Sequence, residues 1–159
     1  MKILGLSLLL FAVGYIGFFS VRHERERPSA YAACLAFLKY IRTGIADYHK
    51  PIPAIIHDFD NEYLQKIGFL TQDGQGNRRW NTNVLEEKAV LFPDDLGMFT
   101  RFLSELGSGF LGDEIRRCDE AIAAMAAGEK KSLSEAPRKS RIYGTLSVGG
   151  ALLLLLVFM

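Results

Sequence analysis

Residues 142–159 read IYGTLSVGGALLLLLVFM and contain no charged side chain. An α-helix rises about 1.5 Å per residue, so a helix over this range would extend about 27 Å, close to the hydrocarbon thickness of a bilayer. A helix that is apolar on every side must be surrounded by lipid or by a large protein core. The stretch therefore predicts a transmembrane helix over residues 142–159.

A second apolar stretch lies near the other end, over residues 3–21, between Lys2 and the charged run RHERER at residues 22–27. A basic residue before an apolar run is also the pattern of a cleaved signal peptide. This run is longer than the apolar region of a usual signal peptide, and no small-residue cleavage site separates it from the charges. We therefore expect an uncleaved transmembrane anchor over residues 1–21. The sequence YAAC at residues 31–34 resembles a lipoprotein site, but the charged run separates it from the apolar stretch.

The segment between the two apolar stretches, residues 22–141, is long enough for one small hydrophobic core and too short for two. The chain has 19 Lys and Arg and 18 Asp and Glu, and Lys2 is the only charged residue outside this segment, so the segment holds 18 of each sign. Affinity for nucleic acid comes mainly from neutralising phosphates. The balanced charge therefore argues against a nucleic-acid partner.

Basic residues flank both apolar stretches on the side of the central segment, and these residues decide the expected orientation. They are Arg22, Arg25 and Arg27 after the first stretch and Lys130, Lys131, Arg138, Lys139 and Arg141 before the second. Because positive residues stay on the cytoplasmic side of a membrane, we expect residues 22–141 in the cytoplasm and both termini outside. A cytoplasmic location favours two thiols over a disulfide for Cys34 and Cys118.

Apolar residues of the central segment recur at helical spacing, which predicts an all-α domain. A first helix, with Pro28 at its start and Ser29 as N-cap, should end near Tyr48 and bury Tyr31, Cys34, Leu35, Leu38, Ile41 and Ile45. A second helix should run from about Pro53 to Gly68 and bury Ile55, Ile56, Phe59, Tyr63, Leu64 and Ile67. The two would form a helical hairpin.

Further helices are expected over residues 84–92, ending before Pro93, and from Asp94 or Asp95 to Leu106. A last one, from about residue 112 to 136, should bury Ile115, Cys118, Ile122, Met125 and Leu133, and Pro137 should end or kink it. Residues 71–83, TQDGQGNRRWNTN, read as a turn-rich loop in which Trp80 covers the core. No stretch predicts a strand. The expected fold is a cytoplasmic helical bundle flanked by two transmembrane helices.

We find no motif for a catalytic, cofactor or metal site. The nearest approach is His57 with Asp58, Asp60 and Glu62, but helical spacing places the two pairs on different sides of a helix. A solvated acidic face explains them better. A small membrane hydrolase that uses Asp and Glu as acid and base is the less favoured alternative.

Several short motifs follow one another in a fixed order along the chain. After the N-terminal anchor come RERP at 25–28, the apolar residues 35–45, PIP at 51–53, LG at 106–107, LGD at 111–113, YG at 143–144 and GGAL at 149–152. This arrangement resembles the stage III sporulation protein AB family of endospore-forming bacteria. The chain departs from the family pattern at Gly44, Tyr48, Lys50 and Pro137, and the resemblance does not extend to residues 71–83.

The resemblance implies a domain similar to the cytoplasmic domain of the platform protein of type II secretion and type IV pilus systems, a helical bundle. It implies a non-enzymatic scaffold in the mother-cell membrane around the forespore, joining a secretion-type ATPase, stage III sporulation protein AA, to the other membrane proteins of a channel complex. Self-association stays open. A general secretion or pilus platform outside sporulation is the alternative.

The expected contact with the ATPase combines the charged run at residues 22–27 with the outer face of the helical hairpin. The residues are Arg22, Arg25, Glu26, Arg27, Pro51 and Pro53. The charged run also suits a solvated extension of a membrane helix with no partner. Charge reversal in this run therefore separates the two interpretations.

Overall fold

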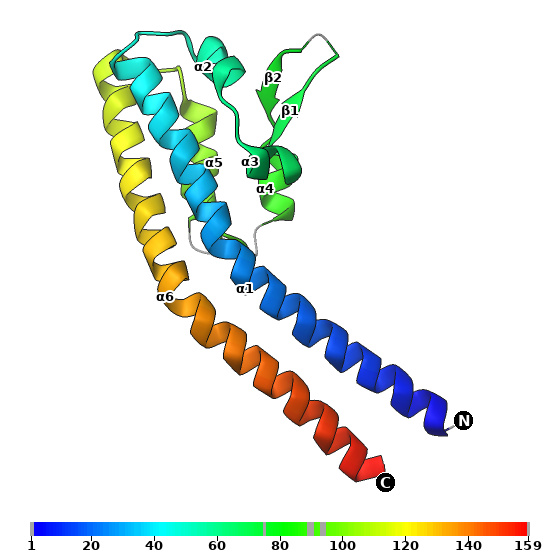
Figure 1. The fold of residues 1–159 in the computed structure, drawn as a ribbon. Helices are drawn as coiled ribbons and strands as arrows, with labels where there is room; N and C mark the ends of the chain where they lie inside the picture. The colour runs from blue at the N-terminus through cyan, green and yellow to red at the C-terminus, as the bar shows by residue number, and fades with distance from the viewer. Residues whose placement is uncertain (1, 75, 89–90, 93–94, 159) are drawn as a thin grey trace. The chain divides into compact units, whose positions relative to one another are not determined.

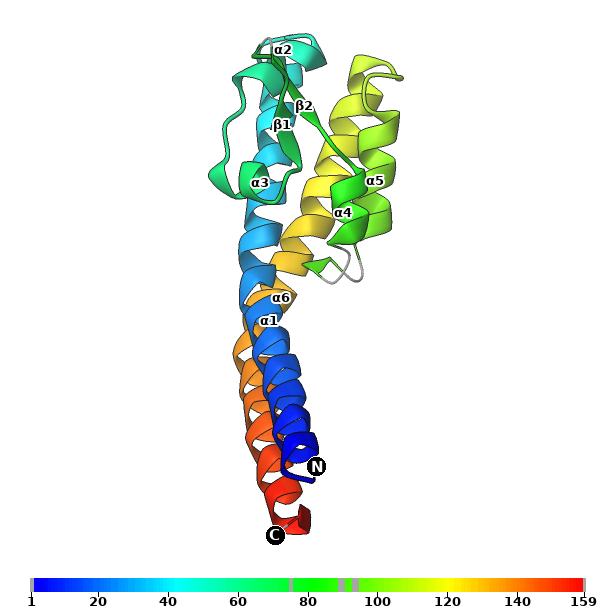
Figure 2. The same ribbon diagram turned by 90° about the vertical axis from the view of Figure 1, so that its right-hand side faces the viewer.

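The computed structural model describes residues 2–74, 76–88, 91–92 and 95–158, and for residues 2–11, 13, 154, 155, 157 and 158 it describes the backbone alone. It contains two compact units (Figures 1 and 2). We call Met1–Pro28 with Ser132–Met159 the terminal unit, and Ser29–Lys131 the central unit. The elements are α1 (Lys2–Ala46), α2 (Ile52–Asp58), α3 (Glu62–Lys66), β1 (Leu70–Gln72), β2 (Arg78–Trp80), α4 (Asn83–Glu87), α5 (Leu96–Glu105) and α6 (Leu111–Phe158). The mostly helical fold confirms the helical part of the prediction.

Pro28, expected at the start of a helix, and Pro137, expected to end or kink a helix, both lie inside helices. Pro28 is within α1, so the predicted helix start with Ser29 as N-cap is wrong, and Pro137 is within α6, which does not end there. A proline inside a helix removes one backbone donor and costs about 3 kcal/mol. Apolar burial just after Pro28 offsets this cost in α1, where Ala30 and Tyr31 are fully enclosed.

The core of the central unit is built on the face of α1 that the helical spacing predicted, because all six residues named for that face are buried. Phe37 joins them and is the centre of an aromatic cluster. Its ring lies 5.2 Å from that of Phe59, 5.5 Å from that of Phe69 and 6.3 Å from that of Trp80. Trp80 is half-buried against the core, which confirms it as a lid.

The predicted second helix is two short helices, α2 and α3, with residues 59–61 between them. Asn61 begins α3, since its side-chain oxygen accepts a hydrogen bond of 3.0 Å from the backbone N–H of Leu64. That local bond competes with helix continuation, which explains the interruption. The predicted buried residues nevertheless face the core, and Gly68 follows the C-cap of α3 with φ +83° as expected.

The turn-rich residues form a β-hairpin, so the prediction of a loop with no strand is wrong. β1 and β2 are antiparallel, with Leu70 opposite Trp80 and Gln72 opposite Arg78. Asp73 holds the turn, because its carboxylate accepts the N–H of Asn77 at 2.8 Å. Three-residue strands are too short to show the alternating pattern by which strands are recognised.

The last helices of the central unit largely follow the prediction. α4 ends at Glu87, earlier than expected, and α5 begins after Asp95; Pro93 and Asp94 lie outside the described residues. Cys118 and Met125 are buried in α6 as predicted, whereas Leu133 is 56% exposed, which corrects its assignment to the core. Cys34 and Cys118 are free, buried thiols, and burial raises the pKa of Cys118 to about 11.

Within the part of the chain that is described, we find no helix with an apolar stretch long enough to cross a membrane. The predicted spans of residues 1–21 and 142–159 both include residues outside that part: residue 1 and the side chains of 2–11 and 13 in the first, and residue 159 and the side chains of 154, 155, 157 and 158 in the second.

Candidate functional site: the exposed turn between α5 and α6

Two turns meet at one end of the central unit: the connection from α1 to α2, and residues 106–111 between α5 and α6 (Figures 1 and 2). We call residues 106–111 the exposed turn. A Cβ atom on Gly107 would lie 2.8 Å from Cδ1 of Ile52, so the two connections are in close contact. Gly107 also has φ +87°, a conformation that favours glycine. The sequence LG at 106–107 thus allows α5 to turn sharply towards α6.

Large apolar side chains point into solvent at these turns. Phe110 is 86% exposed and Leu111 is 47% exposed, while Tyr48 in the other connection is 68% exposed. A single exposed apolar side chain needs no explanation, but three lie at these two turns. Exposed aromatic side chains are the residue type that contributes most when a protein interface buries them.

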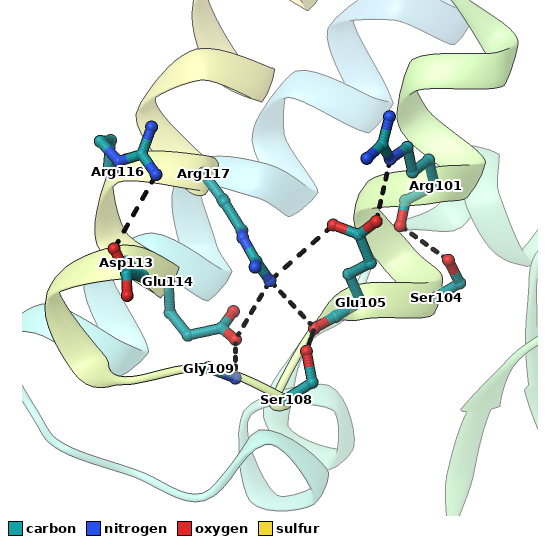
Figure 3. Close-up of polar contacts among 9 residues, drawn as sticks. All are labelled: Arg101, Ser104, Glu105, Ser108, Gly109, Asp113, Glu114, Arg116 and Arg117. Atoms are coloured by element: carbon teal, nitrogen blue, oxygen red, sulfur yellow. Dashed lines mark hydrogen bonds and ion pairs between the residues drawn. The ribbon is translucent and has the colours of Figure 1, made fainter.

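The backbone that carries Phe110 is fixed by a buried acidic side chain (Figure 3). Glu114, only 4% exposed, accepts the N–H of Gly109 at 2.9 Å. Arg117 lies between two carboxylates, with its Nη1 3.8 Å from Oε1 of Glu114 and 3.8 Å from Oε2 of Glu105. Ser108 donates its hydroxyl to the carbonyl of Glu105 at 2.6 Å. The turn is thus held from both of its helices, so little ordering would be needed on binding.

The arginines and glutamates around the exposed turn form ion pairs with one another. Glu105 also accepts a 2.9 Å bond from Arg101, which is the main reason that the pKa of Glu105 is lowered. Arg116 lies 3.0 Å from Glu120. These pairs are largely exposed, so they orient side chains more than they stabilise the fold. The described residues include no group of three potential metal ligands.

The predicted partner-binding residues fall in both units. Arg22, Arg25, Glu26 and Arg27 belong to the terminal unit, where Arg25 is exposed and Arg22 pairs with Glu26 at 2.9 Å. Arg27 is 7% exposed and lies 3.2 Å from Glu24, so its guanidinium is already engaged. Arg22 and Arg27 each pair with a glutamate. Arg25 is exposed, and it forms no ion pair with any residue that the structure describes.

Pro51 and Pro53 are exposed in the central unit, in the connection to α2 and in its first turn. Pro51 immediately precedes Ile52, whose side chain approaches Gly107 of the exposed turn. The predicted proline surface is therefore adjacent to the exposed turn. Prolines here also restrict the backbone, which helps to keep the connection in one conformation.

Two of the acidic residues beside His57, Asp58 and Asp60, form ion pairs with different basic residues, and Asp58 also lies 3.4 Å from Nδ1 of His57. Lys50 donates to Asp58 at 2.9 Å, and this hydrogen bond is the main cause of the lowered pKa of Asp58. Asp60 lies 3.5 Å from Arg78. A carboxylate held ionised by its own cation suits a structural role better than acid–base chemistry near neutral pH.

Phe110 was missed by the sequence analysis, which looked for partner contacts among charged residues and prolines. The available signal was a phenylalanine in a helix break with glycines on both sides, GSGFLG at residues 107–112. An aromatic residue in such a break has no helical face to join, so exposure was a reasonable expectation.

A family model described as stage III sporulation protein AB matches residues 2–159 of the chain. Comparison with curated proteins and with solved structures gave no significant match.

Proposed function

Because the chain belongs to the stage III sporulation protein AB family, we propose that it is a non-enzymatic membrane scaffold of the sporulation-specific channel complex between mother cell and forespore. In this role it couples the secretion-type ATPase, stage III sporulation protein AA, to the other membrane proteins of the complex. The proposal assigns it no catalytic residue, cofactor or metal. The observation that carries it is the exposed turn, an aromatic anchor on a pre-ordered helical support.

The surface of the terminal unit supports insertion of both ends into a bilayer. Large apolar side chains point outward from its two helices: Tyr15, Ile16, Phe18 and Phe19 from α1, and Leu146, Val148, Leu152, Leu153 and Leu156 from α6. The hydroxyls of Ser20 and Thr145 bond to carbonyls one turn earlier, those of Ile16 and Arg141, at 2.9 Å each. Polar groups satisfied within their own helix are what lipid requires.

We place the spans in the mother-cell membrane surrounding the forespore, with the central unit in the cytoplasm and both termini outside. This orientation follows from the basic residues on the inner flanks of the two apolar stretches. It sets the exposed turn in the compartment that contains ATP, where a secretion-type ATPase operates.

A topology experiment tests the membrane part of the proposal. Alkaline phosphatase fused after Met159 should be active, and green fluorescent protein at the same position should be dark, because the C-terminus would lie outside. The mature protein should still begin before Val21. A fluorescent fusion, or a chain cleaved after the first apolar stretch, would refute the two-span arrangement.

Co-purification with the ATPase tests the coupling part. We expect Phe110→Ser to reduce recovery of the ATPase at least tenfold, because an exposed aromatic anchor is worth about 2 kcal/mol or more when buried by a partner. Arg25→Glu should reduce recovery less, since a rim charge contributes mainly to the association rate. The matched controls are Leu133→Ser, at another exposed apolar residue, and Lys66→Glu, at another exposed cation.

Unchanged recovery with both Phe110→Ser and Arg25→Glu would show that the ATPase contacts neither the exposed turn nor the membrane-proximal charges. Equal loss in Leu133→Ser would indicate a general effect of exposed apolar residues. Each variant must first show the same urea midpoint of unfolding as the wild type. Unfolding is measured in detergent by the fluorescence of Trp80.

A further inference from the structure

A groove lies between α2 and the hairpin. Its volume is about 490 Å³, and its lining includes Pro53, Ile56, His57, Arg78, Arg79 and Trp80. In Figure 1, β2 is the strand nearer to α2, so the groove follows that strand. All the lining residues belong to the central unit.

The groove has an apolar floor. Ile56 is only 7% exposed and forms its deep part, while Pro53 is exposed at the side. Trp80 is half-buried, and its ring stands edge-on to the ring of Phe37 at 6.3 Å, so one side of the indole packs on the core and the rest lines the groove. A pocket of aliphatic and aromatic groups is suited to an apolar side chain.

The rim of the groove is basic. The side chain of Arg79 is 77% exposed, and its nearest acidic atom is an oxygen of Asp73 at 3.8 Å. Arg78 donates a hydrogen bond to the carbonyl of Phe59 and lies 3.5 Å from a carboxylate oxygen of Asp60, so its charge is already paired. Among the described residues that line the groove there is no carboxylate. The electrostatic complement of this rim is therefore an acidic group.

We propose that this groove binds a short acidic segment of a partner protein that also carries an apolar side chain. The acidic groups would pair with Arg79, whose side chain is 77% exposed, and the apolar side chain would rest on Trp80 and Ile56. Nucleic acid is the poorer occupant, because two arginines neutralise few phosphates and the whole chain has a net charge of only +1. Pro53 also belongs to the predicted ATPase contact, whereas Arg79, Trp80 and Ile56 do not. Loss of peptide binding in Arg79→Glu and loss of ATPase recovery in Phe110→Ser are therefore distinguishable outcomes.

Trp80 is the only tryptophan, so its fluorescence reports directly on the groove. The full-length chain in neutral detergent would be titrated with a pentapeptide of four glutamates around a central leucine. We expect a saturable change in emission that weakens as salt is added. A peptide of four lysines around leucine should give no saturable change, and replacing the leucine by serine should weaken binding severalfold.

Arg79→Glu should lower the affinity for the acidic peptide at least tenfold. The matched charge reversal is Lys88→Glu, at an exposed lysine outside the groove, and it should leave this affinity unchanged. Equal affinity in wild type and Arg79→Glu would overturn the proposal, and so would equal binding of the basic peptide or the absence of any saturable change. Tighter binding of a single-stranded oligothymidylate than of the acidic peptide would also overturn it. Unchanged urea midpoints would show that both variants are folded.

Discussion

Gly128→Ala is expected to destabilise the central unit by about 2–4 kcal/mol, although alanine is the better helix former. A Cβ atom on Gly128 would overlap the ring of Tyr31 and approach Oδ2 of Asp95 to 2.5 Å. Tyr31 is 2% exposed in α1, so its ring has no free space into which it can move. Glycine is therefore needed here for close approach between α6 and α1.

The substitution should also break a buried polar contact. The Tyr31 hydroxyl donates to Asp95 at 2.8 Å, and a hydrogen bond to a charged group is worth about 1.5–3 kcal/mol. Overpacking lowers the stability by about a further 1–3 kcal/mol, and the better helix propensity of alanine raises it by about 1 kcal/mol. The sum of these contributions is a loss that would move the urea midpoint clearly, as followed by Trp80 fluorescence.

Gly97→Ala is the matched control, since a Cβ atom on this glycine in α5 would meet nothing within 4 Å. It should be neutral or stabilise the chain by up to about 1 kcal/mol. Tyr31→Phe separates the two causes: if the lost hydrogen bond matters, its effect and that of Gly128→Ala should be less than additive. A Gly128→Ala variant as stable as the control would contradict the packing described here.

The fold was predictable where the sequence has a long helical period. The buried face of α1 could be read from Tyr31 to Ile45 because helical spacing repeats there over several turns. The continuation of α1 through Pro28 and of α6 through Pro137 could not be predicted, because tertiary burial can outweigh the local cost of proline. The hairpin was missed because its strands are three residues long and give no period of their own.

The candidate site was harder to predict, for a different reason. A partner surface is defined by which side chains remain exposed after folding, and sequence patterns report mainly on which are buried. Charged residues at 22–27 attracted attention, yet Arg27 is enclosed beside Glu24, whereas Phe110 is open to solvent. Pro51 was identified for its backbone, and its neighbour Ile52 is what contacts Gly107 of the exposed turn.

The second large effect is expected at Gly17, where the two helices of the terminal unit approach each other. A Cβ atom on Gly17 in α1 would overlap the Oγ and Cβ atoms of Ser147 in α6. Both are backbone-near atoms of a short side chain, so the contact can be relieved only if the helices separate. In the bilayer that we propose for these helices, association depends on such small residues, because packing replaces the hydrophobic driving force there.

Gly17→Ala should therefore lower the thermal midpoint of the full-length chain in detergent and increase cleavage of the terminal helices by protease. The expected cost is about 1–3 kcal/mol, the usual range for one extra group in a packed contact. Gly14→Ala is the control within the same helix, since a Cβ atom there would meet nothing within 4 Å. It should match the wild type.

A compensating substitution makes this test specific. Ser147→Gly removes the two atoms that the new methyl group would meet, so the double variant Gly17→Ala with Ser147→Gly should recover most of the lost stability. A general loss of helix packing would not be rescued in this way, because removing a second side chain would destabilise the pair further. Full stability of Gly17→Ala alone, or a double variant no more stable than Gly17→Ala, would show that α1 and α6 do not pair through this contact.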